Sequence, residues 1–133
     1  MPGLTILRCF MNPTTELDLS PVPGLTRLDC SLNQLTELDL SPVPELTELK
    51  CSMNQLTRLN LSPVPELRNL DCRENKLNEL DLSLVPGLTE LYCRENDLTT
   101  LDIRALQQLG LLDLSTHVKL IGAPPPDCMV RRI

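Results

Sequence analysis

The sequence repeats itself every 21 residues, and this period constrains the fold more than any other feature. The segment LSPVPEL at residues 40–46 returns at residues 61–67, with a cysteine and the run Met-Asn-Gln between the two copies. A period of about 20 to 50 residues indicates an array of stacked units. The common pattern is LxxLxCxxNxLTxLDLSPVPx, without insertions or deletions over five copies. The coils start at Leu4, Leu25, Leu46, Leu67 and Leu88, and a degenerate sixth coil starts at Leu109.

Each coil contains two short segments in which apolar and polar residues alternate, such as residues 49–51 and 59–61. Because this alternation is typical of half-buried strands, we expect two short strands in every coil. Proline cannot donate to a central ladder, so we expect the Ser-Pro-Val-Pro segments to form an extended, polyproline-II-like outer wall. Residues 104–108, where these prolines are absent, allow a helical turn.

The composition fits a narrow, repeated core. Hydrophobic residues make up 41% of the 133 residues, but there is no Trp, one Phe and one Tyr, so the apolar content is mostly leucine. The net charge of −6 argues against a nucleic-acid ligand, which needs a basic face. No run of about 18 apolar residues predicts membrane insertion. The first ten residues do not resemble a signal peptide, so the compartment is left open.

We expect residues 1–117 to form one solenoid and residues 118–133 to form a degenerate cap with a Pro-rich basic tail. The last ten or so residues are expected to be poorly ordered. The chain opens in the middle of the repeat phase, without a polar cap. A bare end coil exposes its apolar cross-section. Two interpretations follow: the chain is a segment of a longer array, or the first coil self-associates.

The pattern LxxLxCxxNxLxxLDLS resembles the cysteine-containing, 21-residue class of bacterial leucine-rich repeats found in internalin J-like surface proteins. The resemblance runs from Leu4 to about Leu114. It implies a β-rich leucine-rich-repeat solenoid of about five and a half coils, with a parallel sheet on a concave face that binds other molecules. The implied partner is another protein or a cell-surface glycoprotein. The export signal, capping domain and wall anchor of such surface proteins are not visible in this sequence.

One cysteine occurs in each of the first five coils, and the equivalent residue of the sixth coil is Leu114. A site that accepts leucine predicts that the thiols act as small buried hydrophobes. Structural disulfides and a metal or redox role are the alternatives. Cys128 lies outside the pattern, and we expect it to be the one exposed, reactive thiol. The cysteines of the ladder are Cys9, Cys30, Cys51, Cys72 and Cys93.

An asparagine follows each of these cysteines by three residues. We expect its amide to turn inward and to bond backbone groups that open where the coil changes direction. His117 takes the equivalent place in the sixth coil, where we interpret it as decay of the repeat and not as a catalytic residue. The asparagines are Asn12, Asn33, Asn54, Asn75 and Asn96.

The variable positions are the candidates for binding. Between the leucine and the cysteine of each strand, the charges alternate in sign over the first four coils, and the residues are Arg8, Asp29, Lys50, Asp71, Tyr92 and Asp113. We expect ion pairs across the sheet at these exposed positions. Before each asparagine, coils one to three carry apolar residues and coils four and five carry Arg-Glu. The interpretations left open are an exposed apolar contact stripe and a secondary core under the turn. The candidate partner-binding residues are Phe10, Met11, Leu32, Lys50, Met53, Arg73, Tyr92 and Arg94.

The second segment of the coils carries a column of carboxylates: Asp18, Asp39, Asp81 and Asp102, interrupted by Asn60. We expect these groups to accept hydrogen bonds from threonine hydroxyls or turn amides, and calcium bridging is an alternative. No motif of a hydrolase, metalloprotease or phosphate-binding loop occurs, so we expect neither an enzyme nor a cofactor. The predicted function is a protein-binding module. The alternative is a structural spacer or a truncated repeat remnant without a ligand.

Overall fold

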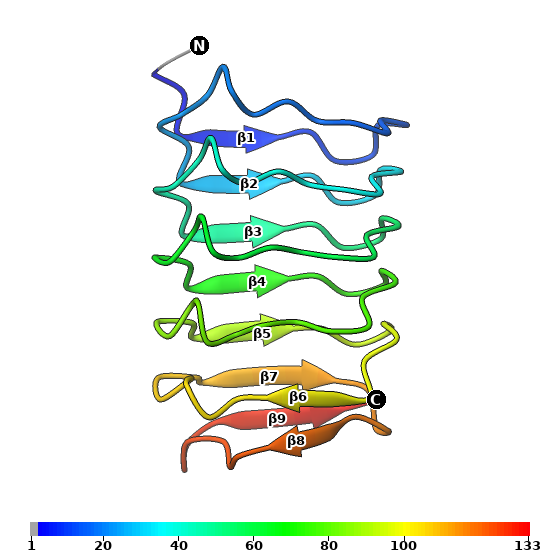
Figure 1. The fold of residues 1–133 in the computed structure, drawn as a ribbon, viewed down its shortest axis with the longest axis vertical. Coiled ribbons are helices and arrows are strands. Elements are labelled where there is room, and N and C mark those ends of the chain that lie inside the picture. Colours follow the sequence, from blue (N-terminus) through cyan, green and yellow to red (C-terminus); the bar gives the residue numbers. More distant parts are fainter. Residues whose placement is uncertain (1–2) are drawn as a thin grey trace.

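A computed structural model describes residues 3–133 as a stack of coils in which no helix occurs. One strand of every coil joins a parallel sheet in the order β1-β2-β3-β4-β5-β7-β9 (Figure 1). A second sheet of two strands, β6 (Thr100–Asp102) and β8 (Lys119–Ile121), lies across the last coils. The strands of the main sheet are β1 (Ile6–Arg8), β2 (Arg27–Asp29), β3 (Glu48–Lys50), β4 (Asn69–Asp71), β5 (Glu90–Tyr92), β7 (Leu111–Leu114) and β9 (Met129–Arg132).

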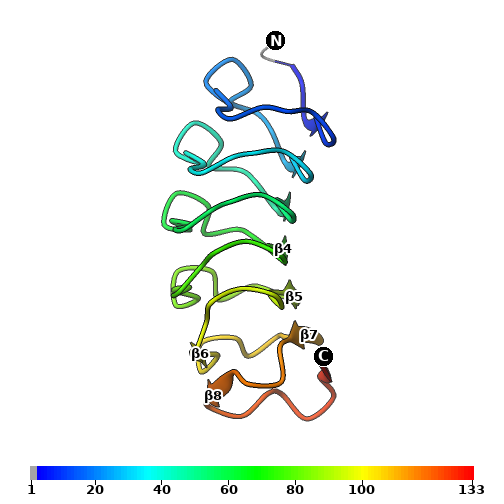
Figure 2. The same ribbon diagram turned by 90° about the vertical axis from the view of Figure 1, so that its right-hand side faces the viewer.

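The register of the main sheet equals the sequence period. From β1 to β7, each residue pairs with the residue 21 positions later, as Leu28 does with Leu49 and Leu49 with Leu70. Seen from the side, the strands lie along the shallow concave side of the stack and the turns along the other (Figure 2). The predicted leucine-rich-repeat solenoid is therefore confirmed, and equal side chains of successive coils lie directly above one another.

The core is built almost entirely from leucine, valine and cysteine. Leu49, Leu70 and Cys51 are fully buried, and so is Val43, the valine of a Ser-Pro-Val-Pro segment. Fully burying one such aliphatic side chain contributes about 1.5–3 kcal/mol. Because every coil repeats the same contacts, the core is one continuous column and not a set of separate clusters.

The outer wall differs from the expectation of extended segments. Each Ser-Pro-Val-Pro segment makes two consecutive tight turns, in which the Val43 amide donates to Leu40 O at 3.0 Å and the Leu46 amide donates to Val43 O at 3.2 Å. Proline suits the second turn because its fixed φ matches the first central position. Residues 104–108 also form turns and no helical turn, since the Leu106 amide donates to Ile103 O at 2.9 Å, as in the other coils.

Within residues 3–133, second strands are present only in the last two coils, and the expectation of one in every coil is wrong. In the preceding coils, single hydrogen bonds join neighbouring coils between the asparagine and the second segment, such as that from the Gln55 amide to Leu35 O at 2.8 Å. The amide two residues after each aspartate is held by that carboxylate and not by the neighbouring coil, as between Ser41 and Asp39. The outer side of the stack therefore depends on turns more than on ladders.

The C-terminal segment also departs from expectation. Residues 129–132 form β9 and pair in parallel with β7, so the prediction of a poorly ordered tail is wrong. Arg132 fixes the segment because its Nη1 donates to Val118 O at 2.9 Å. The chain turns at Gly122, whose φ of 92° favours glycine, and a side chain there would clash with Arg104.

In the part of the chain that the structure describes, the first coil packs against one neighbouring coil, through β1 and β2. Leu4, Leu7 and Leu17 are half-buried, whereas their counterparts in the second coil are buried. Self-association through this coil stays a prediction. Within residues 3–133, no helix of the length and apolarity needed to cross a membrane occurs.

Candidate binding surface on the sheet

The strand pattern places two columns of side chains on the open face of the sheet. In β3, Leu49 is buried while Glu48 and Lys50 on either side of it face outward. One of them, which we call the second column, is the predicted column between the leucine and the cysteine of each strand. The first column was not predicted as a binding position, although the same alternation reveals it. Its members are Ile6, Arg27, Glu48, Asn69, Glu90, Leu111 and Met129.

Under this face, the cysteines form a ladder of free thiols. Cys30, Cys51, Cys72 and Cys93 are buried, and burial raises the pKa of each thiol, that of Cys93 to about 12. The thiols are therefore neutral and act as apolar filling.

The expectation that Cys128 is the one exposed thiol is wrong. Cys9 and Cys128 are both half-buried, and burial raises the pKa of both. Cys9 lacks a coil above it, while Cys128 packs against the core beside β9.

The asparagines cross-link neighbouring coils through their amide groups. The Nδ2 of Asn54 donates to Cys51 O at 3.1 Å and to Cys30 O of the preceding coil at 3.0 Å. Its Oδ1 accepts from the Leu35 amide at 3.0 Å. Asn75 repeats this set of bonds one coil later. His117 is exposed, and in the sixth coil the Ser115 hydroxyl accepts from the Glu95 amide at 3.0 Å, where the preceding coil uses a backbone carbonyl, Arg94 O for the Glu74 amide.

The residue before each asparagine has a left-handed backbone. The φ angles lie between 55° and 61° at Met11, Leu32, Met53, Glu74 and Glu95, which we call the rim residues. Such a conformation costs roughly 1–2 kcal/mol for a residue with a Cβ. It turns the side chain away from the core: Met11 is 69% exposed, Leu32 44% and Met53 46%. The interpretation of a secondary core is therefore wrong for these three residues.

Replacing Met53 tests both the exposure and the backbone conformation of the rim. We expect Met53→Glu to change the free energy of unfolding by less than about 0.5 kcal/mol, because the side chain is exposed and Glu74 already occupies this conformation. Met53→Ile should cost about 1 kcal/mol or more, because β-branched residues disfavour positive φ. Urea denaturation of both variants measures this. A large loss with glutamate would show that the side chain is buried.

The apolar rim is less continuous than its sequence predicts. Phe10 is exposed beside Met11, but Ser31 and Ser52 are buried, and the hydroxyl of Ser52 donates to that of Ser31 at 3.2 Å. The rim residues Leu32 and Met53 are thus each preceded by a buried serine and not by a second exposed apolar side chain.

We expected residues of the second column to form ion pairs with their neighbours on adjacent strands, but the charged side chains have other partners. Lys50 lies in register with Asp71 but approaches Glu48, with 3.9 Å between Nζ and Oε1. Asp71 instead receives two hydrogen bonds from Arg73, of 2.9 Å and 2.8 Å. Arginine reaches back over its own strand end and chelates the carboxylate with two N–H groups, a geometry that lysine cannot provide.

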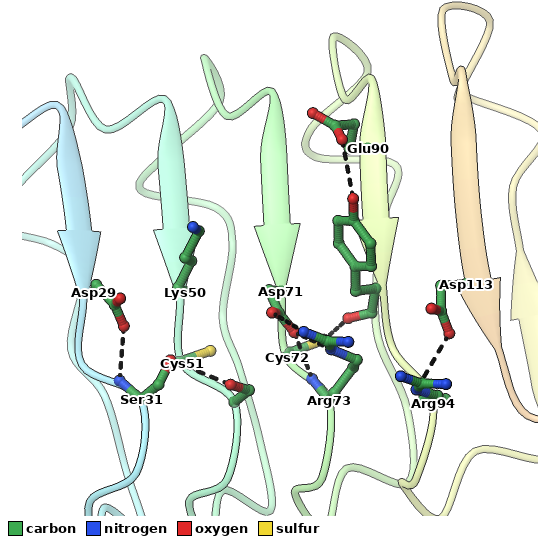
Figure 3. A network of polar contacts seen from close by, with 12 residues as sticks. Asp29, Ser31, Lys50, Cys51, Asp71, Cys72, Arg73, Glu90, Arg94 and Asp113 are labelled. Carbon is green, nitrogen blue, oxygen red and sulfur yellow. Dashed lines mark hydrogen bonds and ion pairs between the residues drawn. The ribbon is translucent and has the colours of Figure 1, made fainter. Parts of the chain in front are cut away.

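The two aspartates of the second column in the C-terminal half are buried and not exposed as predicted. The side chain of Asp113 is 1% exposed and lies between two arginines, at 3.5 Å from Arg94 Nε and 3.5 Å from Arg131 Nη2. Its Oδ1 is buried without a hydrogen-bond partner among the described residues. Figure 3 shows Arg94 beside this carboxylate.

Tyr92, at the end of β5, has arginine side chains over its ring in this half of the surface. The Arg73 guanidinium lies 5.2 Å from the ring centroid and that of Arg131 lies 5.9 Å from it. The hydroxyl donates to Glu90 Oε1 at 3.0 Å, and Asn69 Nδ2 donates to Glu90 Oε2 at 2.9 Å. Burial and the bond to Glu90 raise the pKa of Tyr92, so it is a neutral donor. We call Arg73, Tyr92, Arg94 and Arg131 the Tyr92 cluster.

The structure thus brings together three of the predicted contact residues: Arg73, Tyr92 and Arg94. Lys50 lies two strands from β5, next to Glu48. The contribution of Arg131 could not be predicted from the repeat, because β9 has no repeat signature.

On the outer side of the stack, the carboxylate column is satisfied by turn amides. Asp18 Oδ1 accepts from the Ser20 amide at 2.9 Å, and this bond lowers the pKa of Asp18. Arg104 holds Asp102 with two side-chain bonds of 3.0 Å and 2.7 Å, which lower the pKa of Asp102 to about 2. Within residues 3–133, His, Cys, Asp and Glu side chains nowhere gather in a group of three that could hold a metal ion.

No protein-family model and no curated protein matches this sequence. Among solved structures, the functional domain of InlJ from Listeria monocytogenes, described as including a cysteine ladder, has a TM-score of 0.68 at 29% identity. The match covers 98% of this chain and 39% of that one. The internalin InlF from Listeria monocytogenes has a TM-score of 0.68 at 20% identity, with 84% and 35% covered. The leucine-rich repeat domain of APL1B has a TM-score of 0.51 at 21% identity, with 98% and 54% covered.

The chain therefore spans less than two thirds of each of these structures. The two structures with lower identity show the fold alone. The 21-residue register, the buried thiols and the match to InlJ all indicate the same kind of repeat. The chain is an internalin-like leucine-rich-repeat protein with a cysteine ladder.

Proposed function

We propose that this chain is a protein-binding module that engages its partner through the concave sheet face and the adjoining rim. Internalin-like solenoids are typically protein-interaction modules. The partner is another protein or a cell-surface glycoprotein, and the contact residues are the Tyr92 cluster together with Phe10, Met11, Leu32, Lys50 and Met53.

The observation that carries this proposal is the composition of the rim. Folding alone favours glycine or asparagine in a left-handed conformation. The first three coils instead hold Met11, Leu32 and Met53 there, exposed to solvent. These side chains do not stabilise the core, and their recurrence at the same exposed position of three successive coils supports contact with another molecule. Methionine suits such a contact because it is flexible and polarisable.

The Tyr92 cluster supports the same proposal for the other half of the surface. Tyrosine and arginine are enriched among the residues that dominate binding energies. Here the ring is held between two guanidinium groups, and its hydroxyl is fixed by Glu90. A partner therefore meets a rigid surface and loses little entropy in ordering it.

Affinity capture from an extract of cell-surface proteins tests the proposal. The double variant Met53→Glu/Tyr92→Ala changes both halves of the surface, and Arg58→Gln/Arg68→Gln, on exposed residues outside the two outward columns, is the matched control. We expect the wild-type chain and the control to capture the same proteins and the double variant to lose them. Identical capture by all three would favour the alternative of a structural spacer. Repeating the capture after deglycosylation distinguishes protein from glycan recognition.

A further inference from the structure

Acidic and basic side chains are distributed unequally between the sheet face and the rest of the chain. The sheet face is defined here as the two outward columns and the residue after each cysteine. It holds five acidic residues and six basic ones, a net charge of +1, whereas the rest of the chain carries −7. The basic residues of this face are Arg8, Arg27, Lys50, Arg73, Arg94 and Arg131. The acidic ones are Asp29, Glu48, Asp71, Glu90 and Asp113.

Exposure makes this difference larger. None of the five acidic side chains of the sheet face is exposed, while four of the six basic ones are. Elsewhere in the chain, all 13 acidic residues are exposed. In the Tyr92 cluster the carboxylates of Asp71 and Asp113 lie beneath the guanidinium groups, which are 28% exposed at Arg94 and 46% at Arg131. Solvent therefore meets a cationic surface on an acidic protein.

Two of these guanidinium groups keep unused donors. Arg94 and Arg131 both approach Asp113 at 3.5 Å, and neither donates a side-chain hydrogen bond within residues 3–133. Each guanidinium carries five N–H groups in a planar fork that matches a carboxylate. Arg73, by contrast, already donates two side-chain hydrogen bonds to Asp71.

We propose that the sheet face recognises an acidic segment of its protein partner, and that a partner carboxylate docks on Arg94 and Arg131 beside Tyr92. This proposal rests on the proposed function and specifies the chemistry of the partner. The exposed carboxylates Glu74 and Glu95 bound the cluster at the rim, so an incoming carboxylate is confined to the sheet side. The exposed Arg27 and Lys50 continue the cationic surface along the sheet toward the first coils.

Binding of a synthetic peptide in which glutamate alternates with glycine tests this directly. The chain has one tyrosine and no tryptophan, so the fluorescence of Tyr92 reports on this site without a label. We expect saturable binding that weakens with added salt, and no binding of the counterpart peptide with glutamine in place of glutamate. Equal binding of the glutamine peptide would overturn the proposal, and so would binding of a sulfated oligosaccharide without binding of the glutamate peptide.

Two variants at Asp113 should change the affinity for the glutamate peptide in opposite directions. Asp113→Asn removes the internal competitor for Arg94 and Arg131, so we expect it to tighten glutamate-peptide binding by about threefold or more. Adding Arg94→Gln and Arg131→Gln to that variant should weaken binding about tenfold below wild type. The triple variant leaves no unpaired buried charge at this position, so loss of folding is not expected. The matched control Arg58→Gln/Arg68→Gln should bind as wild type does.

These outcomes separate the inference from the proposed function. Unchanged affinity in the Asp113→Asn and triple variants would overturn recognition of a carboxylate at this site. Capture of a partner by the wild type, and its loss with Met53→Glu/Tyr92→Ala, would still support a binding module in that case. Capture that glutamate peptide displaces from the wild type supports both.

Discussion

Raising the pH from 8 to 10 should lower the free energy of unfolding by about 5 kcal/mol, because four buried thiols can ionise only after unfolding. Burial raises the pKa of Cys30, Cys51, Cys72 and Cys93 in the folded chain far above the usual value of a thiol. A raised pKa contributes stability that is fully present below the unfolded pKa, near 9.0, and is lost as the pH rises toward the folded pKa. For a protein of ordinary stability this loss is a large fraction of the total.

Urea denaturation in the presence of a phosphine reductant, at pH values from 7 to 10, measures the loss. The loss between pH 9 and 10 should be about 1 kcal/mol for each buried thiol, and the slope should rise toward about 1.4 kcal/mol per pH unit above that range. Cys51→Ala should lower stability at pH 7 and reduce this slope by one thiol. Cys128→Ala, at a half-buried thiol, should change the slope less. A stability that is flat between pH 8 and 10 would show that the thiols are not buried.

Removing one central asparagine should destabilise the stack by about 3 kcal/mol or more. In Asn54→Ala the carbonyls of Cys30, Cys51 and Ser52 each lose a donor, and the Leu35 amide loses its acceptor. The site is buried, so water does not replace these bonds without rearrangement. Because the bonds join two coils, we expect the loss in the thermal unfolding of the whole stack.

Asn12→Ala is the matched control for this experiment. Asn12 is exposed, and among residues 3–133 it donates only within its own coil, to Cys9 O at 2.9 Å and to Phe10 O at 3.4 Å. We expect a cost below about 1 kcal/mol for this variant. Equal losses for Asn12 and Asn54, measured by calorimetry, would contradict the role of the asparagines as links between coils.

The parts of the fold that could be predicted are those that every coil repeats. The position of Leu49, the register of β2 on β3 and the inward direction of Asn54 all follow from one period, because identical coils can stack only in register. Burial of Cys51 followed from Leu114, which occupies the same position in the sixth coil without a thiol.

The backbone conformation of the rim could not be predicted from propensity. Nothing in Met53 or Glu74 favours a positive φ, and asparagine follows the left-handed residue in this chain where it more often occupies such a position itself. The asparagine is needed one position later, where its amide reaches the carbonyls of Cys51 and Cys30. A strict requirement at Asn54 therefore sets an unusual conformation at Met53.

The charge arrangement and the C-terminal coil were also outside what the repeat predicts. Alternating signs along a column indicate ion pairs between strands, but long arginine side chains reach other partners, as Arg73 does with Asp71. Residues 129–132 carry no repeat motif, yet they pair in parallel with β7 and extend the main sheet by one strand. This strand contributes Arg131 to the Tyr92 cluster.

Brief alkylation of the native chain with iodoacetamide, followed by mass spectrometry of each cysteine, tests the buried ladder most directly. We expect modification of Cys9 and Cys128, which are half-buried, and protection of Cys30, Cys51, Cys72 and Cys93 until urea unfolds the chain. Modification of Cys51 or Cys72 at the rate of Cys9, under native conditions, would contradict a solenoid with its thiols along the central axis.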